Sequence, residues 1–191
     1  VLDGNTILEW SAATANPLRC NLQGIGFFDG YYDDLQITNN VVATTAYHGI
    51  SVYGGRNVAL VNNTVVNIKA SPTTFPWIGI FNHKNGTPSR DILSSNNIAM
   101  AFKLPSATVN RTVSNNSVIY YPAKVLTNVT AFDYRPKTDS GFVDTGDAGF
   151  APKVDLLNHQ RPYGAAPDRG AYELGSTSSP TSTTSFLLSQ T

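Results

Sequence analysis

The fold is decided by one short phrase that recurs three times: Gly24-Ile25-Gly26-Phe27-Phe28, Gly49-Ile50-Ser51-Val52-Tyr53 and Gly79-Ile80-Phe81-Asn82-His83. After each comes a second phrase that ends in paired asparagines: Leu35-Gln36-Ile37-Thr38-Asn39-Asn40, Val58-Ala59-Leu60-Val61-Asn62-Asn63 and Ile92-Leu93-Ser94-Ser95-Asn96-Asn97. The Gly-Ile steps are 25 and 30 residues long, and the Asn-Asn steps are 23 and 34 residues long. The stretch from Gly24 to Met100 is therefore a repeat.

Repeats of about 20 to 50 residues indicate solenoids, propellers or arrays. Each unit here holds two or three runs of alternating apolar and polar residues, separated by Gly, Asn, Asp and Thr, which is typical of short strands. Stacking such units pairs each strand with its copies above and below and buries a shared core. The paired asparagines fit tight bends, because Asn tolerates left-handed backbone angles, and stacking predicts a ladder of their side-chain amides. The pattern predicts an all-β chain built as a parallel β-helix.

Two parts of the chain resemble known proteins. Leu35 to Val42 and Val58 to Val65 resemble the right-handed parallel β-helix repeat of the pectate-lyase-like superfamily. Phe132 to Lys137, Val143 to Gly146 and Ala166 to Glu173 are similar to the closing segment of many secreted bacterial β-helix proteins, which ends on Gly-Ala-Tyr-Glu. The resemblance implies a right-handed parallel β-helix (solenoid) with an irregular C-terminal cap, in an extracellular protein that is secreted or exposed on a cell or virion surface. It does not select an activity, because the superfamily includes lyases, hydrolases, epimerases, adhesins and phage tailspikes.

We expect three parts along the chain: coils over 1–131, a closing or capping segment over 132–174, and a Ser/Thr-rich tail or linker over 175–191. The closing segment should wrap or cap the open end of the helix, because terminal coils expose core and strand edges. In the tail, Phe186-Leu187-Leu188 offers an alternative, docking on a neighbour. The chain lacks an initiator Met and a signal peptide, so we expect a mature or truncated chain with earlier coils missing.

The composition limits which binding partners and structural features we expect. Thirteen basic and thirteen acidic residues give no net charge, so no nucleic-acid or anionic-membrane partner is indicated, and an acidic sugar would need a local basic patch. Cys20 is the single cysteine, which excludes an intramolecular disulfide and a Cys-based metal site. No run of 18 apolar residues is present, so we expect no membrane span.

One face of the repeat is a candidate glycan groove. If Ile25, Ile50 and Ile80 are buried, we expect Gln23, His48 and Ile78 to point outward and the rings of Phe28, Tyr53 and His83 to stack rung on rung. Ring faces suit the apolar C–H faces of sugars. The substrate-binding candidates are Gln23, Phe28, Tyr53, His83 and Asn85. Simple packing of like side chains is the alternative, and a register slip would turn the rings inward.

A polysaccharide lyase needs a base to remove the proton alpha to a uronate carboxylate, and a cation or metal to stabilise the resulting enolate. The catalytic candidates are His48, Lys84 and Arg56. The metal candidates are Asp29, Asp33 and Asp34, whose oxygens suit a calcium ion. The alternative role of these aspartates is in turns, where the chain must bend.

A hydrolase is a further interpretation. Polygalacturonase-type β-helix hydrolases carry an Asp-Asp pair, a His-Gly and an Arg-x-Lys, and this chain is similar in Asp33-Asp34, His48-Gly49 and Arg135-Pro136-Lys137. Two carboxylates would then act as acid and base across the glycosidic bond. The upstream Asn-x-Asp phrase is absent, and Arg135 to Lys137 belongs to the closing segment.

Two classes of function stay open. The first is a lyase-like, glycan-processing protein that contacts a polysaccharide or surface glycan through a polar, cationic cleft beside a lengthened loop such as Lys69 to Trp77. The second is a non-catalytic structural or receptor-binding module, such as a phage or virion spike, a decoration subunit or a cell-surface adhesin. Proteins of that class are often homotrimers or parts of larger assemblies, which predicts an apolar stripe along one face of the coils.

Overall fold

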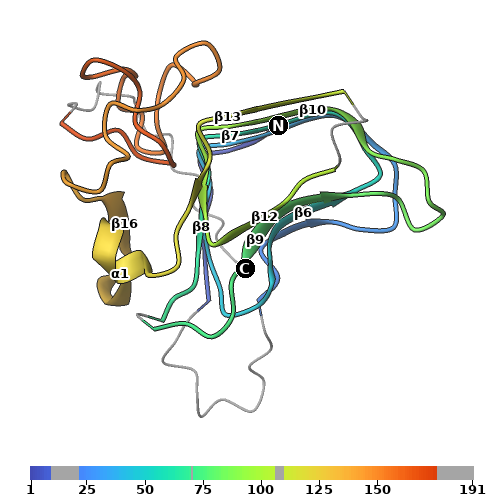
Figure 1. Ribbon diagram of the computed structural model, residues 1–191, viewed down its shortest axis with the longest axis horizontal. Coiled ribbons are helices and arrows are strands. Elements are labelled where there is room, and N and C mark those ends of the chain that lie inside the picture. The colour runs from blue at the N-terminus through green and yellow to red at the C-terminus, as the bar shows by residue number, and fades with distance from the viewer. Residues whose placement is uncertain (10–21, 70, 106–109, 176–191) are drawn as a thin grey trace, which may run out of the picture.

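The computed structural model describes residues 1–9, 22–69, 71–105 and 110–175 (Figure 1). Its strands, in chain order, are β1 (Leu2–Asp3), β2 (Thr6–Leu8), β3 (Ile25–Phe27), β4 (Tyr32–Thr38), β5 (Val41–Ala43), β6 (His48–Tyr53), β7 (Gly55–Val61), β8 (Thr64–Val66), β9 (Trp77–Phe81), β10 (Arg90–Ser95), β11 (Ile98–Ala99), β12 (Ala101–Lys103), β13 (Arg111–Ser114), β14 (Ser117–Val118), β15 (Leu126–Asn128) and β16 (Asp133–Pro136). The helices are α1 (Pro122–Val125) and the 3-10 helix η2 (Val129–Ala131). Within the described residues, no helix is long and apolar enough to cross a membrane.

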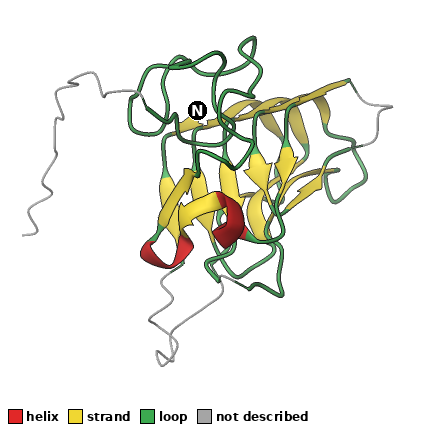
Figure 2. Ribbon diagram, turned by 60° about the vertical axis from the view of Figure 1, so that its left-hand side comes forward, coloured by secondary structure: helices red, strands yellow, loops and turns green. Residues whose placement is uncertain are grey.

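Three parallel sheets carry the repeat. Sheet A has the order β1-β4-β7-β10-β13, sheet B has the order β2-β5-β8-β11-β14, and sheet C has the order β3-β6-β9-β12. The chain passes through sheets A, B and C in the same sequence each time, with strands of successive units side by side (Figures 1 and 2). The predicted all-β fold with stacked parallel strands is confirmed, and it is compatible with a β-helix.

The interior between the sheets is apolar, and all three sheets contribute to it. Leu60 on sheet A, Val65 on sheet B and Ile50 on sheet C are fully buried in one cluster. Ile25 lies in register with Ile50, and Ile50 lies in register with Ile78. Because each unit adds a rung to this shared cluster, no single unit is expected to fold alone.

The two members of each asparagine pair have different structural roles, the first in the bend and the second in a hydrogen-bonded ladder. The first member of each pair has a left-handed backbone, with φ of 53° at Asn39, 55° at Asn62, 57° at Asn96 and 48° at Asn115. The second members, extended at one end by Asn5, form a ladder of side-chain amide bonds, Asn5–Asn40, Asn40–Asn63, Asn63–Asn97 and Asn97–Asn116, at 2.9, 2.9, 2.9 and 2.8 Å. Both the bend and the ladder predicted from the sequence are therefore confirmed.

The closing segment lies along the side of sheet B, where Figure 1 shows it beside β8. The Asn62 amide Nδ2 donates to the carbonyl oxygens of Asp168 and Gly170 at 2.8 and 3.1 Å, and Ala171 is buried in a second apolar cluster outside sheet B. The expectation of a cap over the open end is thus corrected to a lateral cover. Its physical reason is that Val41, Ala43 and their neighbours face outward from sheet B and need apolar partners.

The strands of the three parallel sheets end before the boundary expected at residue 131. The last coil strand, β14, ends at Val118, and β15 pairs with β16 in antiparallel fashion across the boundary expected at residue 131. The Ser/Thr-rich tail from residue 176, the Phe186-Leu187-Leu188 phrase and Cys20 lie outside the described residues.

A buried charge cluster holds the closing segment together. Nη1 of Arg161 lies 3.3 Å from Oε2 of Glu173 and donates to the carbonyl oxygen of Asp168 at 2.8 Å. Glu173 also accepts from the backbone N–H groups of Tyr163 and Asp168, at 2.8 and 2.9 Å. Burial raises the pKa of the Asp168 and Glu173 carboxyls, because little solvent remains to stabilise their charges. The Gly-Ala-Tyr-Glu ending therefore closes the segment on itself through Glu173.

Candidate functional site

The outer face of sheet C is aromatic. Phe28, Tyr53 and Phe81 lie on successive rungs, with ring centroids 5.5 Å apart for Phe28 and Tyr53 and 4.6 Å apart for Tyr53 and Phe81. At the other end of the strands, Trp77 has its ring centroid 4.9 Å from that of His48. With Tyr47, whose ring stacks on Trp77 at 5.7 Å, these six residues form what we call the aromatic face.

Small residues leave room for the rings of the aromatic face above the strands. Gly26, Ser51 and Gly79 lie in register across β3, β6 and β9. A Cβ atom at Gly26 would overlap the ring of Phe28, and one at Gly79 would overlap the ring of Phe81. The rings therefore lie over the strand backbone, and each remains only partly buried.

Ser51 links the two polar members of the aromatic face from below. Its fully buried Oγ accepts a hydrogen bond from Trp77 Nε1 at 2.9 Å and lies 2.9 Å from His48 Nδ1. Burial also lowers the pKa of the His48 imidazole, which favours its neutral form at neutral pH. His48 thus has one nitrogen held by Ser51, and Nε2 makes no hydrogen bond with the described residues.

A cation lies at the edge of the aromatic face. Lys103, on β12, places its Nζ 5.3 Å from the centroid of the Trp77 ring, within the range of a cation–π contact. The face therefore offers ring surfaces, an imidazole and an ammonium group on neighbouring strands.

Two expected members of the groove lie elsewhere. The sequence places His83 on the rung after Tyr53, but that rung is occupied by Phe81, and His83 is buried against Tyr31 with ring centroids 4.2 Å apart. Asn85 joins this second group, with its Nδ2 2.6 Å from the Tyr31 hydroxyl. Ile78, expected to point outward, is fully buried.

The register of β9 explains why the predictions for His83 and Ile78 were wrong. Ile78 aligns with Ile50 and Ile80 with Val52, across an irregularity between His48 and Ile50. Had Ile80 aligned with Ile50, the polar side chain of Asn82 would have faced the core opposite Val52, which is costly. Phe28, Tyr53 and His48 do meet on one face as predicted, and Gln23 is exposed just before β3.

The candidate catalytic residues are held in separate pairs. Lys84 pairs with Asp29 at 3.0 Å, with both side chains mostly exposed, and Arg56 donates Nε and Nη2 to the carboxylate of Asp33 at 3.0 and 2.6 Å. His48 bonds Ser51, as described above. No hydrogen bond or ion pair joins any two of the three candidates in the described structure.

Each of the three candidate metal ligands contacts a different residue. Asp29 faces Lys84, Asp33 faces Arg56, and Asp34 accepts from Asn57 Nδ2 at 2.7 Å. Asp29 and Asp34 have positive φ values of 34° and 58°, as expected of turn residues. Within 1–9, 22–69, 71–105 and 110–175, no group of three or more His, Cys, Asp and Glu residues is placed to hold a metal ion.

Sequence reasoning missed three members of the aromatic face. Phe81 belongs to the third repeat of the Gly-Ile phrase, Gly79 to His83. Ile78 and Ile80 have the same spacing as Ile50 and Val52, and this alternative alignment would have placed Phe81 next to Tyr53. The sequence pattern places Trp77 at the end of the loop from Lys69, whereas in the structure it begins β9. Tyr47, before β6, carries no periodic signal that marks it.

Comparisons with known proteins add no relative. No family model matches the sequence, and neither a characterised protein nor a solved structure matches it significantly.

Proposed function

We propose that this chain is an extracellular, right-handed parallel β-helix protein of the pectate-lyase-like type that binds a polysaccharide or surface glycan on its aromatic face. The observation that carries the proposal is the ladder of Phe28, Tyr53 and Phe81, whose rings follow one another on successive strands of a rigid sheet and keep part of their surface in solvent. The recurring Gly-Ile and Asn-Asn phrases support the fold assignment.

The chemistry of a sugar suits this surface. A pyranose ring has an apolar C–H face that packs on an aromatic ring, and hydroxyls at its rim that need polar partners. His48 and Lys103 supply such partners at one end of the ladder, and the Tyr53 hydroxyl supplies one within it. Because the rings are fixed by the strands beneath them, little side-chain entropy is lost on binding.

We propose binding rather than cleavage. An elimination reaction needs a base and a cation at the same carbon atom. In this chain the predicted catalytic residues His48, Lys84 and Arg56 are held by three different partners, Ser51, Asp29 and Asp33. The cation on the aromatic face, Lys103, lies over the Trp77 ring and two strands away from His48. A glycan-binding module with such a face fits an adhesin or a spike subunit as well as an accessory part of an enzyme.

Tyr53→Ala tests the proposal, and Tyr163→Ala is its matched control. Tyr163 is 62% exposed and lies in the closing segment, away from sheet C. Binding is measured by affinity electrophoresis and calorimetry against a panel of neutral and acidic polysaccharides, with circular dichroism as a check of folding. We expect Tyr53→Ala to weaken binding about two- to tenfold, since a stacked ring contributes about 0.5–1.5 kcal/mol and a tenfold change in affinity corresponds to about 1.4 kcal/mol. Equal affinities for the two variants would overturn the proposal.

The same polysaccharides test for cleavage. The unsaturated uronate ends made by elimination absorb ultraviolet light, and our proposal predicts no increase in this absorbance with time. An increase that His48→Ala abolishes would instead make the aromatic face a lyase site.

A further inference from the structure

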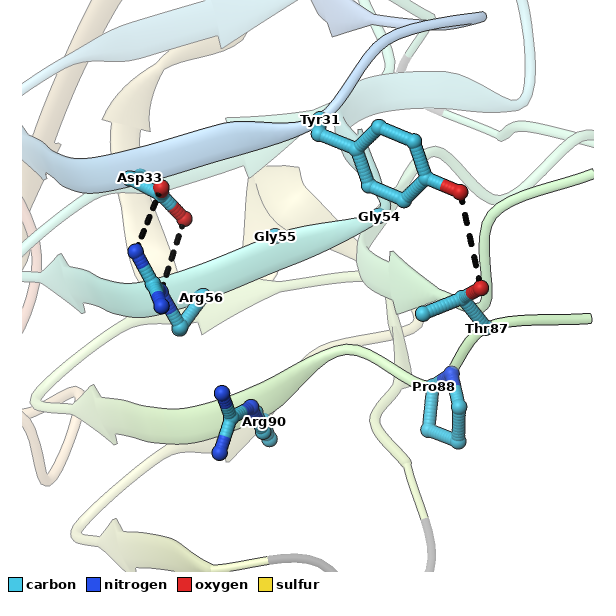
Figure 3. A pocket seen from close by; sticks show the side chains of 8 residues that line it. All are labelled: Tyr31, Asp33, Gly54, Gly55, Arg56, Thr87, Pro88 and Arg90. Carbon is cyan, nitrogen blue, oxygen red and sulfur yellow. Dashed lines mark hydrogen bonds and ion pairs between the residues drawn. The ribbon is translucent and has the colours of Figure 1, made fainter.

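A pocket lies at the corner where sheet C turns into sheet A, one residue after Tyr53 of the aromatic face. It is a cavity of about 280 Å³ whose walls include Tyr31, Thr87, Arg56 and Arg90, over Gly54 and Gly55 (Figure 3). The Cα atoms of Tyr53 and Arg56 are at most about 11 Å apart, because only Gly54 and Gly55 lie between them in the chain. A ligand on the aromatic ladder can therefore extend into this corner pocket.

The floor of the corner pocket is bare for a steric reason. Gly54 has φ of 70°, and a Cβ atom there would lie 2.7 Å from the carbonyl oxygen of Gly30 and 3.1 Å from Cβ of His83. Only glycine fits this position without strain. No side chain projects from residue 54 into the cavity, which stays open to solvent.

The charges around the corner pocket are unbalanced. Asp33, Arg56 and Arg90 lie in register on neighbouring strands β4, β7 and β10, so adjacent members are about 4.8 Å apart along the sheet. Asp33 is engaged by Arg56 through two bonds, at 3.0 and 2.6 Å. Arg90 has no hydrogen-bond or ion-pair partner among the residues that the structure describes, and Figure 3 shows it on the strand next to Arg56. The column thus carries one net positive charge in a chain whose overall charge is zero.

Two like charges opposite each other on adjacent strands repel, and an anion between them removes that cost. The guanidinium fork of arginine binds carboxylate or sulfate oxygens through paired hydrogen bonds. The far wall adds hydroxyls: the Tyr31 hydroxyl lies 3.5 Å from Thr87 Oγ1 and accepts from Asn85 Nδ2 at 2.6 Å, which leaves its proton available. The pocket therefore combines a free guanidinium with hydroxyl donors.

We propose that the corner pocket binds the carboxylate or sulfate group of an acidic glycan through Arg90, with Arg56 and the Tyr31 hydroxyl beside it. This inference rests on the proposed function, since the aromatic face would hold the sugar rings that carry the acidic group. It supplies the local basic patch that an acidic sugar requires of a chain without net charge.

Nuclear magnetic resonance of the full chain tests the pocket and the aromatic face separately. The Arg90 Nε–H signal reports on the pocket, the Arg111 Nε–H signal is its control on the exposed strand β13, and the Trp77 indole N–H signal reports on the aromatic face. Trp10→Phe assigns the indole signal, because the chain has two tryptophans. The probes are sodium glucuronate, sodium sulfate and neutral glucose.

We expect glucuronate to shift the Arg90 signal in a saturable way, glucose to leave it unchanged, and Arg90→Gln to weaken the affinity for glucuronate roughly tenfold or more, the range of a charge-assisted hydrogen bond. A sulfate response equal to that of glucuronate would assign the pocket to oxyanions in general, and a smaller one to carboxylates. Shifts at Arg90 no larger than those at Arg111 would overturn the inference. Failure of any sugar to shift the Trp77 signal would instead count against the proposed function, whatever Arg90 does.

Discussion

Replacing Asn63 by alanine removes the middle amide of the asparagine ladder without straining the backbone, because Asn63, unlike Asn62, does not have a positive φ. The Asn63 side chain is fully buried and makes bonds in two directions. Its Oδ1 accepts from the backbone N–H and the Nδ2 of Asn40, at 3.1 and 2.9 Å. Its Nδ2 donates to Oδ1 of Asn97 and to the carbonyl oxygen of Ile37, at 2.9 and 2.8 Å.

The size of the effect follows from what is left without a partner. In Asn63→Ala the buried N–H of Asn40 loses its acceptor, which costs about 1–3 kcal/mol. The bonds to Asn97 Oδ1, Ile37 O and Asn40 Nδ2 add roughly 1 kcal/mol each at most, since Asn97 Oδ1 still accepts from the backbone N–H of residue 63 and Asn40 Nδ2 still donates to Leu2. We expect a total loss of about 3–5 kcal/mol, a large part of the stability of a domain of this size.

Asn116→Ala is the matched control at the end of the same ladder. Asn116 is only half-buried, so water can replace its amide, and we expect a loss of about 1 kcal/mol. Both free energies of unfolding are measured by urea titration with far-ultraviolet circular dichroism. If Asn63→Ala costs no more than Asn116→Ala, the interior ladder is not a main source of stability and the reasoning is refuted.

Three further changes test the register, the closing segment and its charges. Ile78→Asp should lower the melting temperature sharply, because it buries an unpaired charge, whereas Gln36→Asp on the exposed face should leave it nearly unchanged; equal melting temperatures would refute the register of β9. Asn62→Gly keeps the left-handed backbone but loses two bonds to the closing segment and one to Asn96, so amide exchange should become faster over residues 140–174 to a greater extent than over the coils. Burial raises the pKa of Glu173 above its ordinary value of 4.5, so the folded chain keeps a proton that the unfolded chain has lost. The contribution of Glu173 to the free energy of unfolding should therefore fall as the pH rises above 4.5 and through its raised pKa in the folded chain. In Glu173→Gln the free energy of unfolding, measured by urea titration at several pH values between about 4 and 7, should depend less on pH. An unchanged dependence on pH would contradict the prediction.

The features that could be predicted from the sequence are those that arise from residue type and from the adjacent repeat. The features that could not be predicted depend on exact strand register or on contacts between residues far apart in the chain. Asn62 predicts a bend because Asn tolerates a left-handed backbone, and Asn63 predicts a ladder because an Asn recurs at the same position in the adjacent units. The register of β9 was assigned wrongly because Gly79-Ile80 imitates Gly49-Ile50, although the exposed Asn82 two residues later argues against Ile80 facing Ile50. The position of the closing segment had no local signal, since the bond from Asn62 to Asp168 spans 106 residues.

The placement of the closing segment decides which outer faces of the coils remain exposed. Its anchors include Asn62 at a bend between sheets A and B, and its apolar residues bury outward-facing side chains of sheet B such as Val41, Ala43 and Val66. The outer face of sheet A carries polar and charged side chains such as Asp33, Gln36 and Arg56, which are well solvated. The outer face of sheet C presents the partly exposed rings of Tyr53, Phe81 and Trp77, and its corner with sheet A presents Arg90, which has no partner among the described residues. The ladder that fixes one corner of the coils also keeps these rungs in register, so the aromatic face and the corner pocket are arranged before a ligand arrives.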